Sequence, residues 1–239
     1  MMAWAPHMKL AKLNPKNFWT AEGGMTGLLV FTVGYLFVVC ALGDFPSGIF
    51  LAHILFALII VAGVFSTFRQ RSVRFFSLFL AVAILALNWL EHFHPQQTLV
   101  LLDAVLSLVY LGFLLAMVIL QVFQTGPVTA HRIRGAVIVY LLLGGAWSFL
   151  YHITALTIPN AFHFPEGYAI GTPAALQRLL TYFSFVTLTT TGYGDIIPTH
   201  PLTRTLAVFE ALTGQLYLVI TLARLVSLAV LGYKGEESK

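Results

Sequence analysis

Charged residues are scarce in this chain. Lysine, arginine, aspartate and glutamate make up 9% of its 239 residues, whereas about 25% is usual in soluble domains. Apolar residues reach 59%. So few polar side chains cannot coat a soluble globule of this size, which excludes a water-soluble enzyme. The 13 basic residues, which give a net charge of +4, are not gathered into one aromatic-laced patch. This excludes a nucleic-acid partner.

Cysteine is nearly absent as well. The single residue, Cys40, lies inside an apolar run. A disulfide within the chain and a cysteine-based metal cluster are therefore both excluded.

The chain is rich in long apolar runs. A bilayer core about 30 Å thick needs roughly 20 helical residues, and six runs approach or exceed that length. They are Met25–Leu42, Ile49–Phe68, Phe75–Leu90, Thr98–Phe123, Gly135–Thr157 and Leu202–Leu231. We expect an all-α membrane protein with six transmembrane helices, embedded in the lipid bilayer.

Basic residues occur in alternate connections between these apolar runs. The first and third connections hold no lysine or arginine, only Asp44 and Glu91. The positive-inside rule then puts both termini on the cytoplasmic side of the cell membrane, which is a plasma or inner membrane. Ten of the 13 basic residues fall on one side if there are six spans: Lys9, Lys12, Lys16, Arg69, Arg71, Arg74, Arg132, Arg134, Lys234 and Lys239.

One helix between the last two runs is too short to span. Thr172 followed by Pro173 predicts a helix start, with threonine as the cap and proline at the first helical position. The helix should stop near Thr189, so its roughly 17 residues reach at most about 25 Å. Irregular backbone at membrane depth is tolerated only where protein buries it or water fills a cavity. We therefore expect a re-entrant pore helix that lines a pathway.

The residues after this helix, Thr190 to Gly194, suit the binding of a bare cation. Glycines allow backbone angles that are closed to other residues. Successive carbonyls can then point toward a common axis, and the Thr190 hydroxyl ends this ladder of oxygens. Rings of such oxygens from several chains can replace the hydration shell of a monovalent cation.

The stretch TLTTTGYGD, from Thr187 to Asp195, resembles the selectivity-filter signature TxxTxGYGD of the tetrameric potassium channels. We name it the filter segment. An aromatic helix precedes it and a long helix follows, with Gly214 nineteen positions after Asp195, where that family carries its hinge glycine. The resemblance covers about 100 residues. It implies a four-fold symmetric homotetramer, because one chain with one such segment cannot close a ring.

The resemblance also implies roles for single residues. Asp195 helps Gly194 to shape the outer mouth and supports the filter, and the Tyr193 ring packs against the pore helix near Tyr182. The residues expected to bind K⁺ in the filter are Thr190, Thr191, Gly192, Tyr193 and Gly194.

Thr191 departs from the family pattern, which most often has valine there. The change is nearly isosteric but adds a hydroxyl that needs a partner. We expect K⁺ selectivity to survive. The alternative is a weakly selective monovalent cation channel.

The final helix is expected to hold the cavity and the gate. Gly214 is either a bend or a site of close helix packing. Gln215 would place a polar side chain in the water-filled cavity below the filter. Leu218, Leu222 and Val226 share its face and form either a hydrophobic constriction or a plain packing stripe.

Glu210 is a carboxylate within an expected span, where a charge is costly and indicates a functional role. Its depth is similar to that of His152 on the preceding run. The two could pair and couple pH to gating. Otherwise, Glu210 is a protonated or hydrogen-bonded brace for the pore helix.

The first four runs lack the arginine series of a voltage sensor. Thr98–Phe123 has no lysine or arginine, only Asp103, so strong voltage gating is not expected. Polar residues at the outer helix ends could form a zinc or proton site, or simply pair with one another. They are His53, Asn88, Glu91 and Asp103, with His92 and His94 beside them.

The sequence thus predicts a potassium-selective channel that conducts K⁺ passively and needs no cofactor. Rivals are a non-conducting membrane subunit and a haem- or metal-binding redox protein. The expected organisation is a cytoplasmic tail (1–24), a four-helix region (25–125), a pore domain (126–233) and a short cytoplasmic tail (234–239). The first tail could hold an interfacial helix anchored by Phe18 and Trp19.

Overall fold

A computed structural model describes residues 23–42, 45–67, 71–93, 96–123, 129–168 and 170–237. The expected N-terminal interfacial helix with Phe18 and Trp19 lies outside these residues, as does His94. Most of the described chain is helical, and it also has two strands of two residues each. The elements are α2 (Gly23–Leu42), α3 (Pro46–Thr67), α4 (Arg71–Phe93), α5 (Gln97–Val122), α6 (Ala130–Thr157), β1 (Phe162–His163), α7 (Pro173–Leu188), β2 (Ile197–Pro198) and α8 (Pro201–Glu237).

Five of the described helices are long and apolar enough to cross a membrane, namely α2, α3, α5, α6 and α8. In α4 the apolar stretch is shorter, from Phe75 to Leu90. Arginine at its beginning and glutamate at its end account for this, because they stop the apolar run while the helix continues. The chain is therefore an all-α, multi-pass membrane protein.

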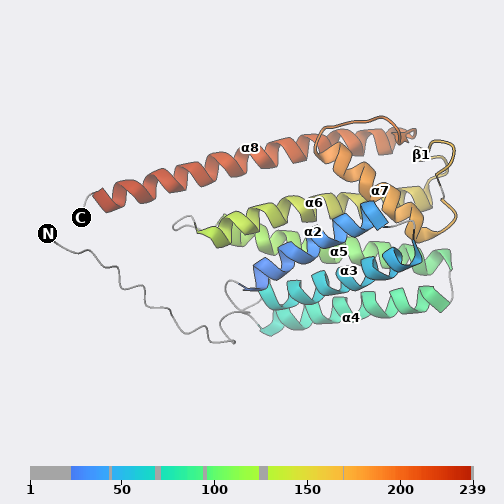
Figure 1. The fold of residues 1–239 in the computed structure, drawn as a ribbon, viewed down its shortest axis with the longest axis horizontal. Helices are drawn as coiled ribbons and strands as arrows, with labels where there is room; N and C mark the ends of the chain where they lie inside the picture. Colours follow the sequence, from blue (N-terminus) through green and yellow to red (C-terminus); the bar gives the residue numbers. More distant parts are fainter. Residues whose placement is uncertain are drawn as a thin grey trace.

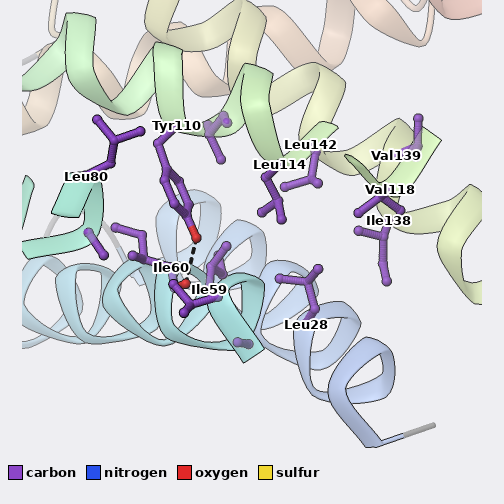
Figure 2. Packing of buried hydrophobic residues seen from close by; sticks show 14 of the residues in the cluster. Leu28, Ile59, Ile60, Leu80, Tyr110, Leu114, Val118, Ile138, Val139 and Leu142 are labelled. Atoms are coloured by element: carbon purple, nitrogen blue, oxygen red, sulfur yellow. Dashed lines mark hydrogen bonds between the residues drawn. The ribbon is translucent and has the colours of Figure 1, made fainter. Parts of the chain in front are cut away.

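The helices α2 to α6 lie side by side in one bundle (Figure 1). Their common core includes Leu28 of α2, Ile60 of α3, Leu114 of α5 and Ile138 of α6, none of which is exposed. Figure 2 shows the Tyr110 hydroxyl reaching across this core to donate to the Ile60 carbonyl at 2.7 Å. In a core without water, a buried hydroxyl needs such a partner.

The short helix α7 lies obliquely between this bundle and α8, and contacts α2, α6 and α8 (Figure 1). Its placement follows from its sequence, since Thr172 and Pro173 start the helix only after the chain has turned back from the end of α6. The predicted short helix is thus present between α6 and α8.

Helix α8 packs on its own chain by one narrow stripe. The buried positions along it are Thr203, Glu210, Gly214 and Thr221, a spacing that follows the 3.6-residue helical repeat. Apolar residues on its other faces are exposed in the single chain. They include Val208, Phe209, Leu212, Leu216, Val219 and Leu222.

The two short strands pair antiparallel, with Phe162 opposite Pro198 and His163 opposite Ile197. They join the connection after α6 to the residues that follow the filter segment. Sequence analysis missed this pairing, because two-residue strands leave no periodic pattern.

Candidate functional site

The start of α7 has the predicted cap. The Thr172 side chain accepts a hydrogen bond from the Ala175 amide at 3.2 Å, and Pro173 occupies the first helical position. Both features fix where the helix begins. They set the register of α7, whose 16 residues carry the chain into the filter segment.

The end of α7 is closed by a Schellman motif, which directs the chain into the filter segment. The Thr190 amide donates to the Thr187 carbonyl at 2.9 Å, and the Thr191 amide donates to the Val186 carbonyl at 2.9 Å. This motif needs a left-handed residue after the helix. Thr190 fills that place with φ of +57°. Such an angle is a strained conformation for a β-branched residue and is typical of functional sites.

From Thr190 to Gly194, every second residue of the filter segment has a positive φ. The angles are +57° at Thr190, +59° at Gly192 and +78° at Gly194, and among the described residues neither Thr191 nor Tyr193 has one. A chain that alternates in this way forms neither helix nor strand. The sequence predicted this freedom for the two glycines but did not foresee it for Thr190.

The extra hydroxyl of Thr191 finds a partner. Thr189 donates its single hydroxyl proton to the Phe185 carbonyl at 2.7 Å. Thr191 therefore donates to the Thr189 oxygen, 2.9 Å away. The departure from valine is thus accommodated by a threonine beside it.

We expect Thr191→Val to leave ion selectivity unchanged and to lower stability only slightly. The variant loses one partly exposed hydrogen bond, which is worth about 0.5–1.5 kcal/mol. Ion selectivity measured in liposomes, with thermal unfolding alongside, tests this, and Thr189→Val is the matched control for the same pair. A large change in selectivity would show that the hydroxyl acts on the ion path itself.

Thr190, which follows the end of α7 in the filter segment, contacts α8. The Gln215 amide donates to the Thr190 hydroxyl oxygen at 3.3 Å, so the residue expected in the cavity lies next to the residue expected at the filter's inner end. On the other side, the Tyr140 hydroxyl of α6 reaches the Leu188 carbonyl at 3.4 Å.

Gly214 lies against the end of the pore helix. A Cβ added there would clash with the Leu188 carbonyl oxygen and stand 2.9 Å from the Leu188 Cδ1. Helix α8 runs without interruption through this position. Of the two readings of Gly214, the contact favours close packing.

The residues expected to form the gate lie on a free face of α8. Leu218, Leu222 and Val226 are 51%, 66% and 54% exposed in the single chain, and Gln215 above them is exposed too. None of them is needed to pack α8 on its own chain. They are available to line an axis shared with other copies.

At the outer end of the filter segment, the Asp195 carboxylate lies near the phenols of Tyr168 and Tyr182. The Tyr168 hydroxyl donates to Asp195 at 3.4 Å. Burial, with the neighbouring Asp195 carboxylate, raises the pKa of Tyr182 to about 12. Tyr182 therefore stays a neutral donor at neutral pH. Tyr193 lies 71% exposed in the single chain.

Glu210 is fully buried, but its partners differ from the predicted one. It accepts a hydrogen bond from Tyr151 and lies 2.5 Å from the Ser184 hydroxyl. Neither ring nitrogen of His152 has a hydrogen-bond partner among the described residues. The predicted pairing with His152 is wrong, because neighbouring helical residues point about 100° apart. Tyr151 faces α8, and His152 does not.

His152 instead lines a pocket of about 110 Å³. The pocket lies between the four-helix region and the start of α7, and His53, Asn88 and Asp103 line it as well. Asn88 donates to Asp103 at 2.8 Å. Three of the four residues predicted to gather at the outer helix ends are thus brought together, while the side chains of Glu91 and His92 lie outside the description.

The zinc hypothesis for this pocket is not supported. Within the described ranges, no three histidine, cysteine, aspartate or glutamate side chains come close enough to hold a metal ion. The hydrogen bond between Asn88 and Asp103 fits the simpler reading, in which these polar groups pair with one another.

Comparison with known proteins places the filter segment in a recognised class. Residues 179–230 match the family model described as ion channel. The match begins within α7, includes the filter segment and ends within α8. It confirms the predicted resemblance to the pore-loop potassium channels. Searches among curated proteins and among solved structures gave no match. The chain is a multi-pass membrane protein in which residues 179–230 are similar to an ion-channel family.

Proposed function

We propose that the chain is a potassium-selective channel, which conducts K⁺ passively as a homotetramer. The observation that carries this proposal is the alternating backbone of the filter segment at the end of a re-entrant helix. Positive φ at Thr190, Gly192 and Gly194 lets the carbonyls between them turn to one side instead of two. Such a ladder offers oxygens to an ion that has shed its water.

In this proposal, neutral oxygens favour a monovalent cation such as K⁺ over divalent cations. Carbonyl and hydroxyl groups replace the hydration shell of a monovalent cation, whereas divalent ions prefer carboxylate ligands. Thr190, Thr191, Gly192, Tyr193 and Gly194 carry no charge. Asp195 alone is charged, and it lies beyond them at the outer mouth. We therefore place K⁺ at Thr190, Thr191, Gly192 and Tyr193.

Four copies around an axis account for the exposed parts of the chain. One filter segment cannot surround an ion, and cyclic symmetry closes a ring from identical chains. In the single chain Tyr193 is exposed. The faces of α8 that point away from α6 and α7 are apolar and exposed as well. In the tetramer these groups meet the neighbouring copies, the lipid or the cavity.

The proposed topology has six spans and cytoplasmic termini. Helix α4 has 23 residues and packs against α3 and α5 in the bundle (Figure 1). We count it as the sixth span, since its ends extend beyond the apolar stretch. With six spans, the ten basic residues of the tails and of two connections share the cytoplasmic face.

Flux of K⁺ through the purified chain in liposomes tests the proposal. With K⁺ inside and Na⁺ outside, the proposal predicts a reversal potential near that of K⁺ and little dependence on voltage, because α5 has no basic residue. Empty liposomes are the control. A reversal potential near zero supports the weakly selective channel, no flux supports the non-conducting subunit, and a coloured protein supports the redox protein.

A further inference from the structure

Glu210 lies where three helices meet behind the filter segment. It projects from α8 with no solvent exposure, and its Oε2 accepts a hydrogen bond from the Tyr151 hydroxyl of α6 at 2.6 Å. Its Oε1 lies 2.5 Å from the Ser184 hydroxyl of α7. The Ser184 oxygen is also 2.8 Å from the Gly144 carbonyl of α6.

Counting protons decides the direction of these contacts. A serine hydroxyl carries one proton, yet Ser184 faces two acceptors if Glu210 is ionised. A carbonyl oxygen can only accept, so Ser184 must donate to Gly144. Glu210 must then donate to Ser184, and a carboxyl group donates only when it is protonated. Tyr151 donates to the other carboxyl oxygen, so every polar group has a partner.

The charges around Glu210 favour the same state. Among the described residues no basic side chain pairs with it, and the titratable groups that face it are the phenols of Tyr151 and Tyr140, both on α6. Helix α7 contributes only the Ser184 hydroxyl. An unpaired carboxylate at membrane depth is expensive, and a buried acid without a cation avoids this cost by staying neutral.

We propose that Glu210 is a neutral carboxylic acid, which forms a directed hydrogen-bond chain from Tyr151 through Glu210 and Ser184 to the Gly144 carbonyl. This chain ties α8 to the pore helix and to α6. Ser184 lies one turn before the end of α7, so the chain holds the helix from which the filter segment starts. Glu210 is a positioning residue that touches no ion.

Loss of this proton breaks the chain at one point. Ionised Glu210 can no longer donate, and Ser184 must give its proton either to Glu210 or to Gly144. Either the Gly144 carbonyl loses the Ser184 hydroxyl as a donor, or the carboxylate is left with the Tyr151 hydroxyl as its single donor. This consequence rests on the proposed function: the pore helix loosens, and K⁺ flux falls as the pH rises.

The protonation state is measured without any flux. Infrared spectra of the purified protein at neutral pH should show a carbonyl band of a protonated carboxylic acid that is missing in Glu210→Gln. The exposed Glu166 provides the control, because Glu166→Gln should leave the band in place. If Glu210→Gln removes only a carboxylate band, the inference is wrong even where the channel conducts.

Flux variants test the positioning role. Glutamine keeps a carbonyl for Tyr151 and an N–H for Ser184, so Glu210→Gln should retain most of the flux and flatten its fall at alkaline pH. Glu210→Ala should lower the flux about tenfold or more, since buried partners lose their hydrogen bonds. Equal losses in the two variants, or an unchanged alkaline profile in Glu210→Gln, would overturn the role. If the parent chain itself does not conduct, the proposed function fails, while the infrared band still decides the state of Glu210.

Discussion

Replacing Gly192 with alanine should abolish K⁺ flux. Its φ is +59°, and no atom lies within 4 Å of the added Cβ in the single chain. The cost therefore comes from the backbone: an L-residue in the left-handed region costs about 1–2 kcal/mol. In the proposed tetramer this cost arises four times, which gives about 4–8 kcal/mol for the closed filter. The measurement is K⁺ flux in liposomes.

Gly112→Ala is the matched control for this experiment. Gly112 lies within α5, and an added Cβ there meets no atom within 4 Å either. Alanine favours a helix over glycine by about 1 kcal/mol. The control variant should conduct like the parent chain and unfold no earlier. Normal flux in Gly192→Ala would mean that residues 190–194 do not form the ion path.

Gly214→Ala should lower both stability and K⁺ flux. The added Cβ would clash with the backbone oxygen of Leu188, and a backbone atom cannot rotate away as a side chain can. Overpacking of this kind costs about 1–3 kcal/mol in each chain. The end of α7 has to move, and the filter segment begins there. Thermal unfolding in detergent and flux in liposomes measure the two effects.

This variant also separates the two readings of Gly214. If the glycine served only as a hinge, alanine would stiffen α8 and raise its helix propensity by about 1 kcal/mol. The protein would then unfold later, with gating alone changed. If Gly214 packs against α7, the protein unfolds earlier. Gly112→Ala again shows what alanine does where space is free.

The membrane helices were predictable from the sequence because hydropathy and capping are local. The predicted run Met25–Leu42 became α2 from Gly23 to Leu42, and the predicted short helix from Pro173 became α7. A threonine before a proline defines a helix start wherever the helix packs. Apolar length likewise defines a span before any contact is known.

The partners within the site were not predictable, because they depend on how helices face each other. Depth along two helices suggested His152 for Glu210, but rotation about the helix axis gave Tyr151 instead. Ser184 came from a third helix. The left-handed Thr190 depends on the Schellman motif, which forms only where α7 actually ends. In the sequence, a positive φ was indicated only at the glycines, Gly192 and Gly194.

Imaging of the purified protein in K⁺ by electron cryomicroscopy tests the central claim most directly. The account predicts four copies around one axis, with residues 190–194 of each copy lining it and ion density between them. Gln215 and Leu222 should face the cavity below. A single or paired chain, or filter segments turned toward lipid with no density between them, would contradict the account.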